Sequence, residues 1–252
     1  MKLTVLGSGT AVPSAKRASP CILIETDEVK ALCDTGPGSL RQLAKKGVRL
    51  DEIDSIVYSH LHIDHTADLA PFLFASKYAQ DMPRTKHLHV IGPQGIKRFY
   101  KNLIKAYGSY ITPDHFTIAW SELSEGSLLL NGLCVKAIPV AHARGSIALR
   151  FEEGNGKSIV YSGDTDYCNN IVTLARETDL LLLECSFPEH MKCEGHLIPS
   201  LAGTIARESL CKMLVLTHFY PPCDNHDLLT PLKNEFAGHV VLAEDLMSFN
   251  VT

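Results

Sequence analysis

The chain has 252 residues, with 24 lysines and arginines against 28 aspartates and glutamates, so its formal charge is −4 with histidine neutral. Hydrophobic residues make up 45% of the chain and charged residues 21%, a balance that excludes a disordered or low-complexity protein. The mild acidity excludes a strong overall attraction for polyanions. The unusual feature is the presence of 12 histidines.

Segments that would direct the chain to a membrane or out of the cell are not evident. The first apolar run, at 3–6, is too short for a signal peptide, and no stretch approaches the ~18 apolar residues of a membrane helix. The eight cysteines are scattered without a CxxC pair, which favours reduced thiols and a cytoplasmic location. No linker divides the chain, so we expect a single domain over 1–252.

The predicted elements, in chain order, change from strands alone to strands alternating with helices. They are strands at 3–6, 21–25 and 30–33, a helix at 38–46, a strand at 53–58, a helix at 93–106, strands at 128–140, 147–151, 158–162 and 180–184, a helix at 201–207 and a strand at 213–217. This order predicts an α/β (α+β) fold with sheets sandwiched between helix layers.

The densest group of histidines directly follows the strand at 53–58. It is Ser59-His60-Leu61-His62-Ile63-Asp64-His65. His60 and His62, two positions apart in an extended segment, point the same way and can bind one ion. Asp64 and His65, where the chain turns, would then face a second ion. Imidazole and carboxylate together suit zinc, with manganese or iron as alternatives.

Three later segments repeat the pattern of an apolar strand followed by one possible ligand. The strands end at His142, at Asp164 in Ser162-Gly163-Asp164-Thr165, and at His218 after Thr217. A carboxylate such as Asp164 can bridge two cations. The candidate metal ligands are therefore His60, His62, Asp64, His65, His142, Asp164 and His218.

With these residues in order, the sequence resembles the metallo-β-lactamase superfamily, whose HxHxDH motif matches residues 60–65. The resemblance runs from the first strands to His218 and implies a four-layer αββα sandwich with a dinuclear centre at one edge of the sheets. It implies that His60, His62 and His142 bind one metal, that Asp64, His65 and His218 bind the other, and that Asp164 bridges them.

A second resemblance concerns the branch of the superfamily. Three segments are similar to ribonuclease Z and related phosphodiesterases. They are residues 6–13, Asp34-Thr35-Gly36, and residues 194–206, which contain His196. The match departs at Ile63, where that family often has Gly, and at His196-Leu197-Ile198, where it has His-Ser-Thr. The short link at 152–157 leaves no room for the long tRNA-binding arm that many members carry.

These observations favour a phosphodiesterase that uses a hydroxide bound between two divalent metal ions. Asp64 would orient the nucleophile, and His196 would donate a proton or a hydrogen bond to the phosphate or the leaving group. Glu184, at the end of the strand at 180–184, would orient His196 or a ligand histidine, or is merely a strand-end acid. The alternatives are tRNA 3′-processing by ribonuclease Z activity, and hydrolysis of a thioester, lactone or β-lactam.

The expected partners follow from this interpretation. They are a phosphodiester-containing substrate, which is either a small molecule or a nucleic acid, and no membrane. A homodimer is expected only because many relatives dimerise. We expect the remaining histidines, at 87, 89, 115, 190, 226 and 239, to have no catalytic role.

Overall fold

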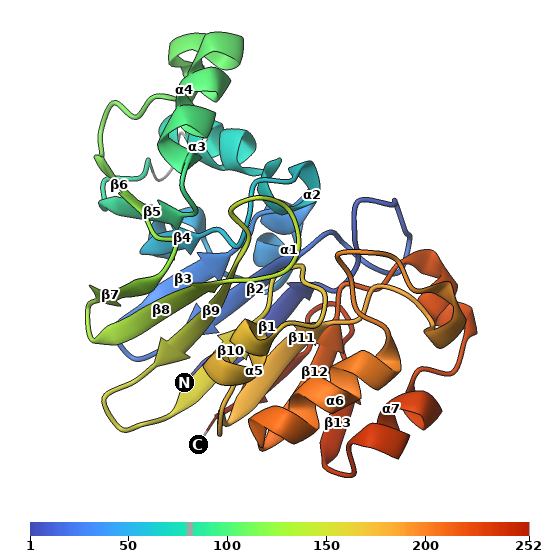
Figure 1. Cartoon of the computed structure of the whole chain (residues 1–252). Helices are drawn as coiled ribbons and strands as arrows, with labels where there is room; N and C mark the ends of the chain where they lie inside the picture. The colour runs from blue at the N-terminus through green and yellow to red at the C-terminus, as the bar shows by residue number, and fades with distance from the viewer. Residues whose placement is uncertain (80–82, 252) are drawn as a thin grey trace.

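A computed structural model describes residues 1–79 and 83–251 and shows two seven-stranded sheets packed face to face (Figure 1). The first sheet has the order β14-β1-β2-β3-β4-β5-β6 and the second the order β13-β12-β11-β10-β9-β8-β7. The strands of the first sheet are β1 (Lys2–Gly7), β2 (Cys21–Glu25), β3 (Lys30–Cys33), β4 (Ser55–Val57), β5 (Leu88–Gly92), β6 (Ile118–Glu122) and β14 (Ser248–Asn250). Those of the second are β7 (Gly126–Leu130), β8 (Leu133–Pro139), β9 (Ile147–Glu152), β10 (Ser158–Tyr161), β11 (Leu180–Glu184), β12 (Met213–Thr217) and β13 (His239–Leu242).

Helices cover the outer face of each sheet, which confirms the predicted αββα sandwich. The helices are α1 (Ser39–Lys45), α2 (Ile63–Thr66), α3 (Leu69–Tyr78), α4 (Ile96–Tyr107), α5 (Asn169–Leu174), α6 (Pro199–Ser209) and α7 (Leu229–Glu235). Leu43, Phe72 and Ile96 from α1, α3 and α4 pack on the first sheet. Ile171 and Ile205 from α5 and α6, together with α7, pack on the second. Short 3-10 helices are η1 (Leu50–Glu52), η2 (Gly108–Ile111), η3 (Glu189–Met191) and η4 (Pro221–Asn225).

The main core lies between the two sheets, where side chains such as Val5, Ile24, Phe151, Leu182 and Val215 meet. β10 and β11 are buried at every position, because the other sheet covers one of their faces and helices cover the other. This burial explains why these strands are continuous apolar runs in the sequence.

The predicted strand at 128–140 is wrong as a single element. It is a hairpin, in which β7 and β8 pair antiparallel and Leu130 lies opposite Leu133. Asn131 and Gly132 form the turn, with φ of 43° and 89°. An Asn-Gly pair with positive φ at both positions is the sequence signal of a two-residue hairpin turn.

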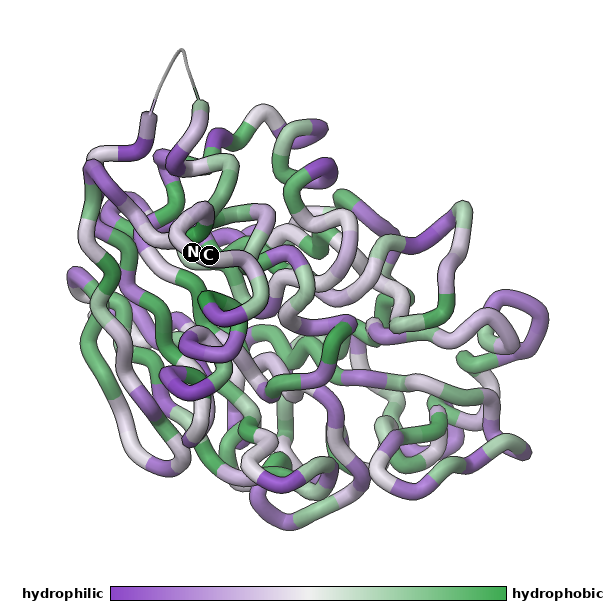
Figure 2. Tube along the Cα trace, turned by 90° about the horizontal axis from the view of Figure 1, so that it is seen from above, coloured by the Kyte–Doolittle hydropathy of each residue, from purple (hydrophilic) through white to green (hydrophobic). Residues whose placement is uncertain are grey.

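Both ends of the chain meet at one sheet edge. β14 pairs antiparallel with β1, so that Lys2 lies opposite Asn250. The Met1 carbonyl accepts a hydrogen bond from Val251 N at 2.9 Å, and the two termini lie side by side in Figure 2. The prediction did not include β14, because this short strand pairs with β1 at the opposite end of the sequence. It also did not include β6, β13 or α3.

The strand directions decide where the candidate ligands lie. β3, β4, β5 and β6 are parallel in the first sheet, and β10, β11, β12 and β13 are parallel in the second. β8 runs in the same direction as β10, because both pair antiparallel with β9. The loops after β8, β10, β11 and β12 therefore all leave from one edge of the second sheet. The loop after β4 of the first sheet meets them there, because its histidines lie beside His142 and Asp164.

Candidate metal centre

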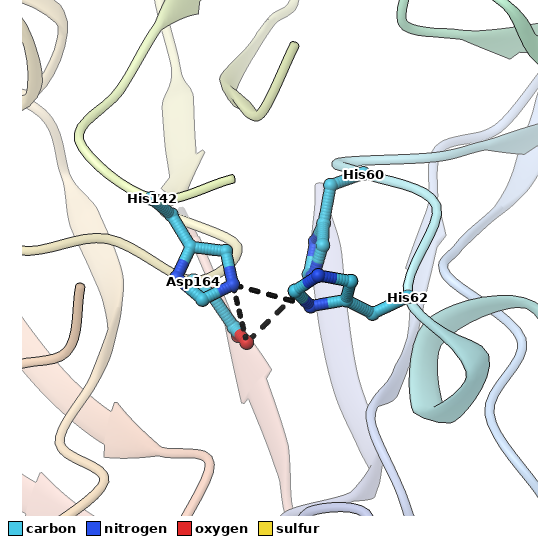
Figure 3. Close-up of side chains that lie close together, drawn as sticks. All are labelled: His60, His62, His142 and Asp164. Atoms are coloured by element: carbon cyan, nitrogen blue, oxygen red, sulfur yellow. Dashed lines mark hydrogen bonds and ion pairs between the residues drawn. The ribbon is translucent and has the colours of Figure 1, made fainter. Parts of the chain in front are cut away.

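The first group of candidate ligands brings together three distant parts of the chain. His60 and His62 come from the loop after β4, His142 from the loop after β8 and Asp164 from the loop after β10, and their ligand atoms all lie within 4.8 Å of one another. Figure 3 shows the three imidazoles and the carboxylate of Asp164 pointing toward one common space. His142 Nε2 lies 3.2 Å from His62 Nδ1, and Asp164 Oδ2 lies 3.7 Å from His60 Nε2 and 3.6 Å from His142 Nε2.

The second group lies on the other side of the same carboxylate. Asp64 and His65 come from α2 and His218 from the end of β12. Asp164 Oδ1 lies 3.3 Å from His65 Nε2 and 3.2 Å from His218 Nε2, while Asp64 Oδ2 lies 3.7 and 3.6 Å from the same two nitrogens. Asp164 thus presents one oxygen to each group, as a bridging ligand must.

Several of these atoms have no hydrogen-bond partner among the described residues, although they are buried. They are His60 Nε2, His65 Nε2, His218 Nε2 and Asp164 Oδ1. Buried polar atoms without a partner cost about 1–3 kcal/mol each, so a cluster of them needs an explanation. Ligand atoms bound tetrahedrally to an ion at about 2.0–2.1 Å lie about 3.3 Å apart, close to the separations here. The residues therefore fit a metal centre.

The pKa shifts of His60, His142 and Asp164 suit a cation. Burial, helped by the charge of His65, lowers the pKa of His60 well below its usual value, and burial likewise lowers the pKa of His142. Burial alone would raise the pKa of Asp164, but the charges of His218 and His65 outweigh it and hold this pKa well below its ordinary value. Neutral imidazoles and an ionised carboxylate are the forms that bind metal ions. For His65, burial would lower the pKa, but the charges of Asp164 and Asp34 outweigh it and raise this pKa, so His65 must lose its proton when a metal ion binds.

A set of hydrogen bonds to Nδ1 fixes how the imidazoles face. His65 Nδ1 bonds Asp34 Oδ2 at 2.7 Å, His142 Nδ1 donates to the Gly195 carbonyl at 2.9 Å, and His218 Nδ1 bonds Ser186 Oγ at 2.9 Å. Because Nδ1 is occupied, Nε2 of each ring is the nitrogen that faces the centre. The sequence patterns did not reveal the roles of Ser186 or Gly195.

Asp34 is the buried acid that binds His65 of the second group. It is 0% exposed, has a positive φ of 57° and accepts hydrogen bonds from Ser59 N, Ser59 Oγ and the Tyr161 hydroxyl as well as binding His65. The carboxylate thereby joins β3, β4 and β10 and anchors the His65 ring. In the sequence, the position of Asp34 at a strand end before Gly36 indicated only a structural acid near the site.

Glu184 and His196 form a pair next to the second group. Glu184 is fully buried, and its Oε1 lies 2.8 Å from His196 Nδ1 and accepts a hydrogen bond from Thr165 N. Its Oε2 accepts from Ser186 Oγ and Leu197 N. His196, Asp164 and His218 place ligand-type atoms within 4.8 Å of one another. Burial lowers the pKa of His196, but hydrogen bonding to Glu184 and the charge of Glu184 outweigh it, so this pKa is raised.

The remaining histidines lie outside this cluster. His87 bonds Thr117 Oγ1 and His89 bonds Ser121 Oγ, at and next to the start of β5. His190 and His226 face each other with ring centroids 4.9 Å apart, and both are exposed. None of these four belongs to the groups with metal-ligand spacing among the described residues.

The fold and the cluster define a class of protein: a metal-dependent hydrolase built on two sheets between helix layers, with its centre at one edge. A family model of the beta-lactamase superfamily domain matches residues 30–219. The chain belongs to this superfamily, in its metallo-β-lactamase form.

Relatives of known name agree with this class. The chain is 27% identical to ribonuclease Z of Mycolicibacterium gilvum, over 98% of this chain and 94% of that protein. It is 29% identical to the probable metallo-hydrolase YhfI of Bacillus subtilis, over 97% of each, and the crystal structure of YhfI superposes with a TM-score of 0.86, covering 98% of both chains. The crystal structure of the short form of human tRNase Z is 26% identical in sequence and superposes with a TM-score of 0.81, over 100% of both chains.

Among the residues described, no helix has both the length and the apolar character needed to span a bilayer.

Proposed function

We propose that the chain is a phosphodiesterase in which His60, His62 and His142 hold one divalent metal ion, Asp64, His65 and His218 hold a second, and Asp164 bridges them. The observation that carries the proposal is the position of Asp164, with one oxygen toward each group of nitrogens and the Glu184–His196 pair beside it. The names of the relatives, ribonuclease Z and tRNase Z, support phosphodiester chemistry.

The donor set supports zinc as the metal, with manganese or iron as alternatives, because imidazole and carboxylate suit all three. When bound, two such ions would supply Lewis acidity toward the phosphoryl oxygens and lower the pKa of a water molecule.

Orientation of the attacking water and protonation of the leaving group would depend on side chains of this protein. Asp64, 7% exposed, would accept a hydrogen bond from the attacking water and orient it toward phosphorus. His196 keeps Nδ1 on Glu184, so Nε2 is the atom that would donate a proton to the leaving oxygen. Glu184 would hold the imidazole in this orientation and favour its protonated form.

Two other functions use the same centre. The named relatives support tRNA 3′-processing, yet β9 and β10 are joined only by residues 153–157, which cannot form a long arm. Hydrolysis of a thioester, lactone or β-lactam needs the metals but has no evident use for the Glu184–His196 pair. We therefore place a phosphodiester first and leave small-molecule and nucleic-acid substrates both open.

A cytoplasmic location remains part of the proposal. All eight cysteines are free in the structure, which supports a reducing compartment. A homodimer also remains a proposal, to be tested by light scattering.

The test combines metal analysis with turnover of bis(p-nitrophenyl) phosphate. We expect about two divalent ions per wild-type chain, a loss of metal in His62→Ala, and retained metal with a rate reduced about 100-fold or more in His196→Ala. His226→Ala is the matched control, because His226 is exposed, bonds the Pro222 carbonyl and lies outside the groups with metal-ligand spacing among the described residues.

Full activity of His196→Ala together with unchanged metal content in His62→Ala would refute the assignment. A thiolester and a lactone belong in the same assay, and strong lactonase activity without phosphodiester turnover would favour the third function.

A further inference from the structure

Two aromatic side chains stand beside the Glu184–His196 pair without a part in the chemistry described above. Phe187 lies in the loop after β11 and Tyr220 in the loop after β12. Their rings stack on each other with centroids 4.6 Å apart and an interplanar angle of 15°. Both side chains are only partly buried. We call these two residues the aromatic pair.

The aromatic pair is oriented by its contacts with the imidazole of His196. Phe187 and Tyr220 meet that ring edge-on, at centroid distances of 5.9 and 6.2 Å and angles of 72° and 74°. His196 itself lies parallel to His218 at 5.8 Å and 13°. The aromatic pair therefore lies next to His196, on the His196 side of the candidate metal centre.

The loops that carry the aromatic pair are tied together. Tyr220 N donates to the Ser186 carbonyl at 3.2 Å, and Cys223 Sγ lies 3.2 Å from the same oxygen. Prolines follow both rings directly, at 188 and at 221–222, which restricts the backbone. The rings are thus held in place before any substrate arrives, which lowers the entropic cost of binding to them.

The chemistry of the aromatic pair selects the kind of group that fits it. The segments 185–188 and 219–222 contain no charged side chain. Lys192, the cation in the following loop, already pairs with Asp166 at 2.7 Å. The Arg17 guanidinium lies 4.6 Å from the ring centroid of Phe219, next to Tyr220, and pairs with Asp224 at 3.0 Å. Partly exposed rings whose described neighbouring cations are already paired suit a flat aromatic group and not a further phosphate.

We propose that the aromatic pair of Phe187 and Tyr220 is a subsite for a nucleobase attached to the leaving oxygen of the substrate. The inference rests on the proposed function, because His196 can protonate only an oxygen within its reach, and the substituent on that oxygen must then lie beside the rings that border His196. Stacking of a base on protein aromatics is strong and tolerant of base identity. The natural substrate is thus a nucleoside-containing diester with its base on the leaving side.

The test uses a dinucleoside phosphate, adenylyl-(3′→5′)-adenosine, and two analogues that each lack one base. Product analysis identifies which oxygen leaves. We expect removal of the base on the leaving side to lower kcat/KM about tenfold or more, and removal of the other base to have a small effect. In Tyr220→Leu, the ratio of kcat/KM with the leaving-side base to kcat/KM without it should fall toward one. Tyr220→Phe retains the ring and should keep the wild-type ratio.

The matched control is Tyr78→Leu, a change in another half-exposed tyrosine that contacts Phe74 on α3. Equal losses on all three compounds in Tyr220→Leu would assign the rings a merely structural role and overturn the inference. A second measurement, the calorimetric affinity for adenosine, the product released from the leaving side, relative to that for ribose, tests stacking without turnover, and equal affinities would also refute the inference. If no diester is hydrolysed at all, including bis(p-nitrophenyl) phosphate, the proposed function fails instead.

Discussion

At the residue scale, Gly195 connects the backbone to a candidate metal ligand. It has a φ of 82°, its carbonyl accepts from His142 Nδ1, and a Cβ at this position would lie 3.1 Å from that nitrogen. Only glycine adopts this conformation without strain and also leaves the imidazole its place. The position of His142 in the first group therefore depends on this one small residue.

We expect Gly195→Ala to reduce metal binding at the first group, because the new methyl group displaces His142. Gly156→Ala is the matched control, since Gly156 has nearly the same φ of 85° but no described atom within 4 Å of a Cβ. Both variants should lose about 1 kcal/mol of stability from backbone strain, measured by denaturant unfolding. Metal analysis should separate them, and equal metal content would contradict the role assigned to Gly195.

Glu184 allows a second prediction at this scale. Glu184→Gln keeps the size of the side chain but removes the charge that raises the pKa of His196. We expect kcat to fall about 10- to 100-fold with metal content nearly unchanged. The control is Glu189→Gln, because Glu189 accepts from Ser200 N and Ser200 Oγ, whereas the described side-chain hydrogen-bond partners of His196 are Glu184 and Ser186. A similar loss in both variants would show that the effect is not specific to the pair.

At the scale of elements, Asp179 joins the starts of three parallel strands at the end of the sheet away from the metal ligands. It directly precedes β11, accepts from Ser158 N at the start of β10 at 2.9 Å, and pairs with Lys212 before β12 at 2.7 Å. Burial alone would raise the pKa of Asp179, but hydrogen bonds from Lys212 and Ser158 outweigh it and lower the pKa below its usual value of 3.8.

A lowered folded-state pKa means that the ionised carboxylate stabilises the fold above about pH 4 and that this contribution disappears as the pH falls through the folded value. We expect Asp179→Asn to lower the free energy of unfolding by about 1 kcal/mol or less at pH 7, because Lys212 is largely exposed. The difference from wild type should shrink below pH 4 in urea unfolding. A difference of the same size at pH 3 as at pH 7 would mean that the charge is not its source.

At the scale of the whole molecule, two features disfavour tRNA as a substrate. The turn at 153–157 between β9 and β10 is short, and the net charge is −4. Binding of a large polyanion depends on many cationic contacts that release counterions. We expect a precursor tRNA to bind weakly at 150 mM salt and to be cleaved much less efficiently than a small diester, as measured by gel shift and 3′-trailer cleavage. Tight binding and precise cleavage would instead place tRNA processing first.

The candidate ligands could be predicted because each is a local feature, a histidine or aspartate directly after an apolar strand. His60, His62, Asp64 and His65 lie within one short segment, so their proximity needs no knowledge of the fold. The division of 128–140 into a hairpin was missed although its Asn-Gly turn is a local signal. The single-domain organisation over 1–252 remains a prediction.

The sequence by itself determined that sheets lie between helix layers and which seven residues are candidate metal ligands, because hydrophobic periodicity and short ligand motifs are encoded by neighbouring residues. The four-layer αββα arrangement was implied by the resemblance to the metallo-β-lactamase superfamily. Three sets of contacts were decided only by the tertiary structure. Glu184 bonds His196. Gly195 and Ser186 orient ligand imidazoles, and Phe187 stacks on Tyr220. These contacts join loops that follow different strands. They form because the parallel strands end at one edge of the sandwich, and local sequence carries no record of which loops that edge brings together.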